Sequence, residues 1–454
     1  MSAPFGTDPG QSPASSLTRR RFLQASLLGA GGLSLAGCGT LEAGLAGAPV
    51  ARGTVTFWDL FGGGDGVRMQ TMLQAFTKQY PQLGLQHITL SWGNPYYTKL
   101  SLATIGDQPP DVGVIHASRL PTFQASNLLQ ELTPQVLSQH GLTADKFAPK
   151  PLRACTIGGK IFALPLDTHP FVMFYNTDLC QKAGLLDAQG NLKPLNSPEA
   201  FTDALTRGKA ASGQWGAVAS INNDTATCWR LFQSFYSQLG GQLLAQEGTK
   251  VVLDDAKALQ VLTFLKDLSV TRKLMPTDVD YAGGIALFAN GRSALYLQGE
   301  WEISTFQTAK TPFSMTLFPN VFGGENGYAV QADFHTLVVP AAGNDSARTD
   351  RALTLIRTLF EQSLTWAEGG HVPAWAPVAD SAKYRQLKPQ SNYAAAAAAA
   401  VIDPPGWYSG SGSNFEIITG SAVGSVLSGQ SEPAAAVRAM RSGLELYAST
   451  PSPV

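Results

Sequence analysis

Hydrophobic positions in the first part of the chain alternate between strand-like and helix-like spacing. Apolar runs predict strands at 54–58, 87–91 and 111–115, and helical spacing predicts helices at 69–80 and 97–105. The glycine-rich stretch after the first strand predicts a tight turn. Strand followed by helix, repeated in this way, is typical of a parallel α/β sheet, which is the fold class we expect.

The same rhythm continues after residue 165. The predicted strands are 171–175, 293–297 and 336–340, and the predicted helices begin at Ser197 and cover 259–274, 285–290, 349–361 and 432–446. Ser197 followed by Pro198 has the residue types of a helix N-cap and first turn. The alanine run 394–400 predicts a buried helix, because alanine is the best helix former.

The first 37 residues have the pattern of an export signal and are set aside from the fold. Arg19–Arg21 before a modest apolar run resemble a twin-arginine signal, although general secretion stays open. Leu35-Ala36-Gly37-Cys38 resembles a lipobox, so Cys38 is the predicted lipidation site. A transmembrane anchor or buried helix is the alternative, but the run is shorter than the roughly 20 residues of a span. We expect residues 38–52 to tether a lipid-anchored protein to the periplasmic or extracellular face of the cytoplasmic membrane.

The composition is that of a soluble globular protein, with 44% hydrophobic residues and a formal net charge of −1. Without a basic excess, neither nucleic acid nor a lipid surface is an expected partner of the folded part. The chain beyond the signal is too long for one compact core and suits two lobes. The three later cysteines, Cys155, Cys180 and Cys228, cannot all pair, so buried thiols are favoured and a Cys155–Cys180 bridge stays open.

Several short segments carry a family resemblance through their shared order along the chain. They are Thr56–Trp58 with its glycine turn, Tyr96–Leu100, Pro110–Val112, His116–Leu120, Gly158–Pro165, Phe174–Leu179, Phe288–Ala294, Gly299–Trp301 and Gly369–Ala374. Each is weak alone. Together they make the mature chain resemble, nearly from end to end, the family 1 extracellular solute-binding proteins of ABC importers, the maltose-binding-like group.

The resemblance implies a two-lobed periplasmic-binding-protein fold of the maltose-binding type (type II), with α/β lobes joined by crossing hinge segments. The expected N-terminal lobe is 53–165 plus about 305–345, and the expected C-terminal lobe is 166–304 plus about 346–454. The implied function is capture of a sugar or oligosaccharide between the lobes, without catalysis, by a monomer that needs no cofactor. The implied partners are ABC permease subunits and a separate ATPase, since this chain has no Gly-x-x-x-x-Gly-Lys-Ser/Thr loop.

A sugar receptor needs flat aromatic rings for the apolar faces of the sugar and planar polar groups for its hydroxyls. Ligands of open α/β sheets lie beyond the carboxyl ends of the strands, so side chains there are the candidates. Trp58 and Asp65 flank the glycine turn after the first strand, and His116, Ser118 and Arg119 follow the third. The plainer explanations are a tight turn, a core histidine and a surface arginine.

Two further segments match parts of the family that contact ligand. Asp167 and His169 lie where relatives supply a polar contact, and His169 in place of a glutamate offers one donor and one acceptor. Asp224 and Trp229 match a rim carboxylate followed by an aromatic residue. The stacking aromatic expected two residues after the acid is Ala226, so maltose-like stacking is in doubt.

Trp301 resembles the sugar-stacking tryptophan of the family and is the principal candidate for a binding residue. Trp92 and His335 complete the predicted site, although a single aromatic residue or histidine is more often structural. The resemblance names neither the sugar nor its length and linkage.

Other functions stay open on sequence alone. The 33 carboxylates could supply a glycosidase pair, but His-Glu-x-x-His and Gly-x-Ser-x-Gly are absent and the six histidines lack ligand spacing, so no metal site is predicted. A lipid-anchored adhesion or sensory protein is a second rival. Glycerol phosphate or another polyol is a third, but phosphate calls for converging cations and only Arg68, Arg119 and Arg230 are obvious candidates.

Overall fold

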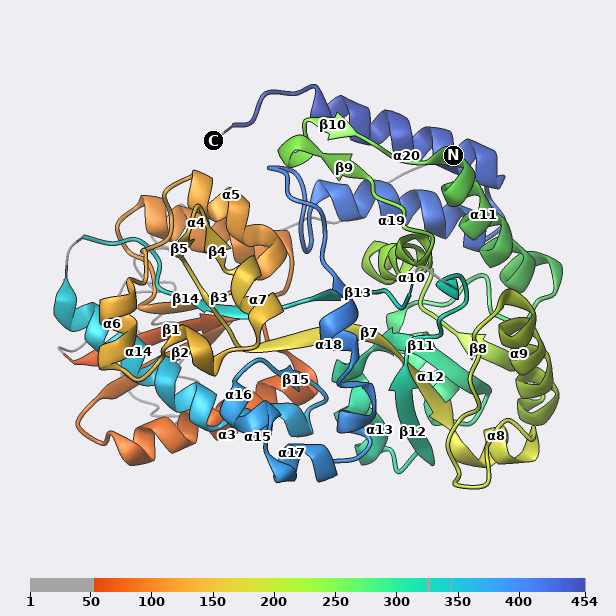
Figure 1. Cartoon of the computed structure of the whole chain (residues 1–454), viewed down its shortest axis with the longest axis horizontal. Coiled ribbons are helices and arrows are strands. Elements are labelled where there is room, and N and C mark those ends of the chain that lie inside the picture. The colour runs from red at the N-terminus through yellow and green to blue at the C-terminus, as the bar shows by residue number, and fades with distance from the viewer. Residues whose placement is uncertain (1–52, 325–326, 344, 454) are drawn as a thin grey trace, which may run out of the picture. The chain divides into compact units, whose positions relative to one another are not determined.

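Two mixed β-sheets, each accompanied by helices, make up the part of the chain that the computed structural model describes, residues 53–453 without 325–326 and 344 (Figure 1). The predicted signal peptide, the tether and Cys38 lie outside these residues. Among the described helices, none is both long and apolar enough to traverse a bilayer.

The first sheet has five strands in the order β2-β1-β3-β14-β6. β1 runs parallel to β2 and β3, whereas β14 is antiparallel to β3 and β6. The strands are β1 (Thr54–Asp59), β2 (Gly84–Thr89), β3 (Val112–His116), β6 (Leu164–Pro165) and β14 (His335–Val338), beside a short hairpin of β4 (Thr156–Ile157) and β5 (Lys160–Ile161). The helices here are α3 (Gly63–Gln79), α4 (Asn94–Ile105), α5 (Leu120–Ala125), α6 (Pro134–Gln139), α7 (Pro149–Ala154), α14 (Ser346–Glu361), α15 (Ser363–Glu368) and α16 (Ala376–Ala379).

The second sheet has seven strands around a long central strand, β7 (Asp167–Asn176). The others are β8 (Trp215–Val218), β11 (Ser293–Gly299), β12 (Phe313–Leu317), β13 (Val330–Asp333), β15 (Val372–Pro373) and β16 (Ala400–Val401), beside a hairpin of β9 (Leu244–Ala245) and β10 (Lys250–Val251). The helices here are α8 (Thr177–Lys182), α9 (Pro198–Ser212), α10 (Thr225–Gln238), α11 (Asp255–Lys266), α12 (Tyr281–Ala289), α13 (Ile303–Thr308), α17 (Ala382–Gln386), α18 (Ala396–Ala399), α19 (Asn414–Leu427) and α20 (Pro433–Ala448).

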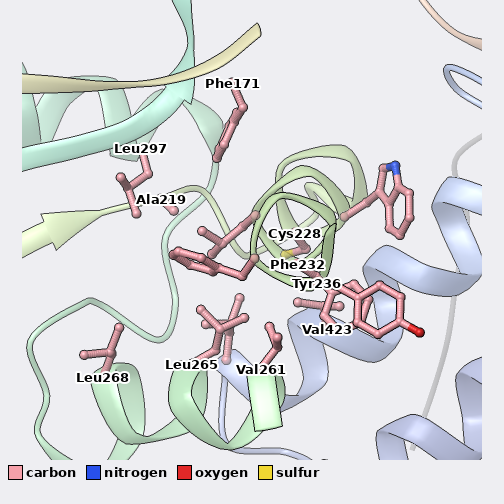
Figure 2. Packing of buried hydrophobic residues seen from close by; sticks show 14 of the residues in the cluster. Phe171, Ala219, Cys228, Phe232, Tyr236, Val261, Leu265, Leu268, Leu297 and Val423 are labelled. Carbon is pink, nitrogen blue, oxygen red and sulfur yellow. The ribbon is translucent and has the colours of Figure 1, made fainter. Parts of the chain in front are cut away.

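Each sheet has its own hydrophobic core. Every residue of β7 is buried, because successive side chains point to opposite faces and both faces are covered. Phe171 and Met173 enter one cluster, whereas Val172 and Phe174 enter another. In the first of these clusters, Cys228, Phe232 and Tyr236 of α10 lie among Val261 and Leu265 of α11 and Val423 of α19 (Figure 2).

The chain passes from one sheet to the other through a single residue at two places, and it returns to the second sheet once more through α14 and α15 to β15. Leu166 alone separates β6 of the first sheet from β7 of the second, and Phe334 alone separates β13 from β14. The two crossings are adjacent, since the backbone N–H of Leu166 donates to the carbonyl oxygen of His335 at 2.7 Å. Residues on these crossings therefore stand where the two sheets meet.

Most strands and helices predicted from periodicity are confirmed, and several boundaries shift. The glycine-rich turn opens α3, whose first helical residue is Gly63 and whose buried face includes Met69 and Phe76. Ser197 caps α9 as predicted, because its side chain accepts a hydrogen bond from the backbone N–H of Ala200 at 3.1 Å. The predicted helix 259–274 is split, since α11 ends at Lys266 and a π-helical turn follows.

The prediction of a buried helix at 394–400 is wrong. Only Ala396–Ala399 form a helical turn, and Ala395 and Ala398 are exposed. Ala400 is extended and pairs with Val330 of β13. Tertiary pairing therefore outweighs the helix propensity of alanine in this stretch. Cys155, Cys180 and Cys228 are buried free thiols, as favoured from the sequence.

The expected lobe boundaries differ from the packing in two stretches. β12 pairs with β7 in the second sheet, although 305–345 was expected in the N-terminal lobe. α14 buries Leu353 and Ile356 in the cluster of the first sheet, although 346–454 was expected in the C-terminal lobe. The reason is that the chain returns to the first sheet through β14 and continues into α14, and periodicity carries no signal for such a return.

Candidate functional site

A cavity of about 530 Å³ lies between residues of the two sheets, within the range typical of small-molecule sites. The segments that follow β1 and β2 and the last residue of β3 contribute one side, as expected for ligands at the carboxyl ends of strands. The lining residues are Leu60, Phe61, Gly62, Gly63, Gly64, Asp65, Trp92, His116, His169, Asn223, Asp224, Ala226, Arg230, Tyr281, Trp301, Glu302, Thr305 and His335.

Of the predicted site residues, seven line this cavity: Asp65, Trp92, His116, His169, Asp224, Trp301 and His335. They come from separate parts of the sequence and are brought together by the two sheets.

Three histidines form the floor of the cavity. His116 ends β3 and stands opposite His335, the first residue of β14, in the antiparallel register. His169 lies on β7, beside the crossing between sheets. The rings of His169 and His335 are stacked with centroids 3.9 Å apart, and the ring of His116 meets both edge to face at 5.1 and 4.8 Å.

Asp167 lies behind this floor and holds two of the rings. His335 Nδ1 is 2.8 Å from Asp167 Oδ2, and His169 Nδ1 is 3.1 Å from Asp167 Oδ1. The indole N–H of Trp366 and the backbone N–H of His335 also donate to this carboxylate, at 2.6 and 3.0 Å. Burial opposes the charge of Asp167, but the neighbouring His335 and His371 and the hydrogen bonds lower its pKa well below the usual value. Because an ionised carboxylate only accepts hydrogen bonds, the Nδ1 atoms of His169 and His335 carry the protons.

The cavity-facing rings of His116 and His169 are neutral. Burial lowers the pKa of His116 well below its usual value, and the neighbouring histidines and Arg230 lower it further. Burial also lowers the pKa of His169 to about 3, despite its hydrogen bond to Asp167. Neutral rings offer lone pairs as well as N–H groups to whatever occupies the cavity.

His371 is a buried cation that the sequence prediction missed. Its Nε2 is 3.1 Å from Asp65 Oδ1, and its Nδ1 is 3.0 Å from Glu300 Oε1 and 3.2 Å from Asp167 Oδ2. The Nδ1 contacts are ion pairs without hydrogen-bond geometry. Burial alone would lower the pKa of His371, but the charges of Asp65 and Asp167 raise it well above the usual value. The ring stacks on Trp366 at 4.2 Å, so an imidazolium is fixed behind the floor.

Aromatic residues form one wall of the cavity. The indole N–H of Trp301 donates to the hydroxyl of Tyr281 at 2.7 Å, and that hydroxyl bonds to Glu302. The guanidinium of Arg230 lies 5.1 Å from the centre of the Trp301 ring, a cation–π contact. Trp92 and Tyr281 are 40% and 37% exposed, which is high for large apolar side chains and leaves ring surface open to a ligand.

Asp224 supplies an acceptor at the edge of the cavity. Its Oδ1 caps α10 by accepting a hydrogen bond from the N–H of Thr227 at 2.9 Å. Its Oδ2 is buried and has no hydrogen-bond partner within the described residues. Burial raises the pKa of this carboxyl group. Ala226, where the family pattern suggests an aromatic residue, lines the cavity next to it and leaves space rather than a stacking ring.

Two predicted tryptophans do not line the cavity. Trp58 is half-buried, its carbonyl oxygen accepts a hydrogen bond from the Tyr96 hydroxyl at 3.1 Å, and Lys99 lies over its ring. Trp229 is fully buried, and its indole N–H donates to Asp403 at 2.8 Å. Trp58 packs against the core cluster of the first sheet, and Trp229 of α10 is part of a core cluster of the second sheet.

Three predicted polar residues are also placed outside the lining. Asp167 is behind the floor, as described above. Ser118 is buried and bonds to Asp333, while its hydroxyl accepts the N–H of Ser411 at 3.0 Å. Arg119 lies over the ring of Tyr97 at 4.6 Å and faces a separate surface depression. These residues hold neighbouring segments together instead of lining the cavity.

Several lining residues escaped the prediction of the saccharide site, among them Tyr281 and Glu302, and Arg230 was considered only as a cation for phosphate. Arg230 stands four residues after Ala226 on α10, so helical spacing places both on one face and could have indicated it as a site residue. Glu302 directly follows the predicted Trp301. Nothing in the sequence near Tyr281 indicates that α12 begins at the cavity.

Comparisons with known proteins agree with this geometry. The profile of a family described as bacterial extracellular solute-binding protein matches residues 71–413. An arabinooligosaccharide-binding protein of Bacillus subtilis is 27% identical over 229 residues, 49% of this chain and 48% of that protein. A maltooligosaccharide ABC transporter solute-binding lipoprotein of Streptococcus pneumoniae is 22% identical over 319 residues, 67% of this chain and 70% of that protein. The chain thus spans about half the length of the first relative.

Solved structures give the fold. A maltose-bound MalE3 of T. maritima aligns with a TM-score of 0.73 at 20% identity, over 87% of this chain and 99% of that one. The GacH receptor of Streptomyces glaucescens, solved unliganded and with acarbose, aligns with a TM-score of 0.71 at 20% identity, over 86% of this chain and 96% of that one. At such identities the likeness establishes the two-lobed α/β fold of maltose-binding proteins, as predicted, and no more.

Proposed function

Because the chain belongs to the family of bacterial extracellular solute-binding proteins, we propose that it captures a neutral saccharide in the cavity between its lobes and delivers it to an ABC importer. The observation that carries the proposal is that aromatic side chains and hydrogen-bonding side chains line the same cavity. Trp301, Tyr281 and Trp92 offer aromatic surface, and Asp224 and the floor histidines offer hydrogen-bonding groups. Apolar sugar faces and hydroxyl rims require this combination.

The charges around the cavity favour a neutral ligand over a phosphorylated one. Of the three arginines considered for phosphate, only Arg230 lines the cavity. Arg68 is paired with Glu368, and Arg119 lies over Tyr97. The lining also includes the acidic residues Asp65, Asp224 and Glu302, which would disfavour a phosphate. Glycerol phosphate is therefore the weaker candidate.

The delivery step of the proposal is domain closure about the segments that cross between the sheets, two of which are the single-residue crossings. Each lobe would consist of one sheet with its helices, and Leu166 and Phe334 would act as pivots. A ligand that contacts both walls of the cavity would favour the closed arrangement. A permease with a separate ATPase would then receive the solute, and the protein itself would act as a monomer.

The proposal places the protein outside the cytoplasm, held by a lipid on Cys38. The motif before Cys38 supports this anchor, and a curated relative is named a lipoprotein. Metabolic labelling with a clickable fatty acid should label the parent protein in cells and leave Cys38→Ala unlabelled. Equal labelling of both proteins would remove the assigned anchor.

Titration calorimetry after a thermal-shift screen tests the binding site. The screen contains arabino- and malto-oligosaccharides and glycerol 3-phosphate, since a ligand that binds only the native state raises the melting temperature. We expect Trp301→Ala to weaken binding of the saccharide found at least tenfold, about 1.4 kcal/mol, because a stacked aromatic surface is lost.

Trp58→Ala is the matched control, since Trp58 was predicted for the site from sequence but does not line the cavity. Its affinity should equal that of the parent protein. If Trp301→Ala binds as tightly as the parent protein, the assigned site is wrong. If cleaved oligosaccharide is recovered after incubation with the protein, the function is that of an extracellular carbohydrate-active enzyme and not that of a receptor.

A further inference from the structure

The floor of the cavity brings together nitrogen atoms of three imidazole rings from three strands. One nitrogen each of His116, His169 and His335 lies within 4.8 Å of the other two. The three residues are only 3%, 3% and 6% exposed. They are separated by 53 or more residues in the sequence, which is why no ligand spacing indicated them.

The Nδ1 atom of each ring is already engaged from behind. His335 and His169 bond to the two oxygens of Asp167, and His116 Nδ1 is 2.6 Å from the hydroxyl of Tyr97. The Nε2 atoms make no hydrogen bond within the described residues, and that of His169 is fully buried without a partner. A buried polar atom without a partner is costly, which points to a ligand at these nitrogens.

We propose that His116, His169 and His335 bind one divalent transition-metal ion of the zinc class through their Nε2 atoms. Histidines that bind metal commonly donate their other ring N–H to a carboxylate or another acceptor, which fixes the tautomer and orients the ring. Asp167 and Tyr97 stand in those positions here. Three histidines with a fourth position open to a cavity form a known type of zinc site.

The donor set selects the class of ion. Imidazole nitrogen suits zinc, nickel, cobalt and copper, whereas magnesium and calcium prefer oxygen. Tetrahedral bonds of about 2.0–2.1 Å place ligand nitrogens roughly 3.4 Å apart, so binding must draw the three nitrogens closer and turn the rings of His169 and His335 out of their stacked arrangement at 24°.

A second group of possible ligands, Asp167, His335 and His371, is less suitable. The oxygens of Asp167 already accept hydrogen bonds from His169, His335 and Trp366. The Nε2 atom of His371 bonds to Asp65, so this nitrogen is not available to a metal ion. The metal position is therefore on the cavity side of Asp167.

Metal and solute would share one cavity, since the three histidines line the space that we assign to the saccharide. The metal inference does not depend on that assignment. If both bind, each changes the affinity of the other by the same factor. A metal titration without sugar tests the ion alone.

The experiment uses the purified protein without a histidine tag, stripped with a chelator and titrated with Co²⁺ and then Zn²⁺. We expect one Co²⁺ per chain, with the visible absorption of a low-coordinate nitrogen-ligated ion, and its displacement by Zn²⁺. Mg²⁺ at the same concentration should not compete. Absence of a stoichiometric cobalt signal would overturn the inference.

His169→Gln should weaken Zn²⁺ binding at least a hundredfold, since it removes the buried unpartnered nitrogen. His140→Gln is the matched control, because His140 pairs with Asp350 and does not line the cavity. Equal affinities of the two variants would place the ion elsewhere. Far-ultraviolet circular dichroism and thermal melts check that both variants are folded.

X-ray absorption spectroscopy on the parent protein with Zn²⁺ bound gives a test that needs no variant. Three imidazole ligands are expected, with water or another light ligand in the fourth position. A bound ion with fewer than two imidazole ligands would contradict the proposed site even if the variants failed to fold.

Discussion

Asp333 is a buried acid that ties the end of β13 to the segment after β3. Its Oδ1 accepts hydrogen bonds from the N–H groups of Ser118 and Phe334 at 3.2 and 2.8 Å, and its Oδ2 bonds to the hydroxyl of Ser118. Burial raises the pKa of Asp333 to about 7, and the neighbouring Asp403 adds to this. Below about pH 7, a proton on this carboxyl group is therefore part of the folded state.

The raised pKa of Asp333 predicts how stability changes with pH. The folded state holds the proton more tightly than the unfolded state, whose aspartates have a pKa near 3.8. This contribution to the free energy of unfolding is complete below about pH 4 and is lost as the pH rises to about 7. Asp333→Asn imitates the protonated form, so its melting temperature should fall less between pH 4 and 7.

Thermal melts in buffers from pH 4 to 8 measure this difference. Asp107→Asn makes the same chemical change at an exposed position and should follow the parent protein. Parallel curves for the parent protein and Asp333→Asn would mean that Asp333 is ionised in the folded state.

At the scale of elements, helix caps connect stability to the cavity wall. Asp280 caps α12 by accepting a hydrogen bond from the N–H of Gly283 at 2.8 Å, and Tyr281 follows it into the cavity. Ser197 caps α9, which contributes no lining residue. Removal of either cap should cost about 1 kcal/mol of the free energy of unfolding.

We expect Asp280→Ala and Ser197→Ala to lower the urea midpoint to a similar extent, but only Asp280→Ala to weaken saccharide binding. Fraying of the first turn of α12 would displace Tyr281 and with it the hydrogen bond to Trp301. Titration calorimetry separates the two variants. If Asp280→Ala binds the saccharide as tightly as the parent protein, the position of Tyr281 does not depend on the cap of α12.

Elements with regular periodicity were accessible from the sequence, and those set by tertiary pairing were not. β1, α3 and α9 follow from apolar spacing and from Ser197, because these signals are local. The alanine run failed because its last residue pairs with β13. The place of α14 beside the first sheet depends on a return of the chain that local spacing does not encode.

At the scale of the whole molecule, segment 409–413 joins residues of the two sheets. It leads into α19, yet the N–H of Ser411 donates to Ser118 and the hydroxyl of Ser411 accepts the indole N–H of Trp92 at 3.2 Å. A Cβ on Gly412 would lie 2.8 Å from the Cα of Gly93. Only glycine permits this close approach beside a cavity residue.

Gly412→Ala should therefore weaken saccharide binding severalfold, because the clash moves the segment away from Trp92. Gly190→Ala is the control, since Gly190 has a similar positive φ of 83° but a Cβ added there would have no other atom within 4 Å. Both variants carry the backbone strain of a left-handed alanine, and only one carries the clash. Calorimetry on both variants isolates the contact, and equal affinities would remove its assigned role.

Site residues were predictable from the sequence where they directly follow a strand that apolar spacing reveals. Asp65, His116 and Trp301 were predicted from such positions and from the family resemblance, and they line one cavity. The sequence could not show that Trp229 is a core residue and not a binding residue, because the rotation of a helix about its own axis decides whether an aromatic side chain faces the core or the cavity. His371 is placed by contacts with residues more than 60 positions away, which no local pattern records.

The single-residue crossings have a consequence for the order of events during capture. Asp167 follows Leu166 and His335 follows Phe334, so the floor groups stand next to the proposed pivots. Atoms near an axis of rotation travel little, whereas the distant rims that carry Trp92 and Tyr281 sweep through a wide arc. An entering ligand would thus contact the same floor groups whether the lobes are open or closed. Closure of the walls that carry Trp92 and Tyr281 would then determine whether the ligand stays bound.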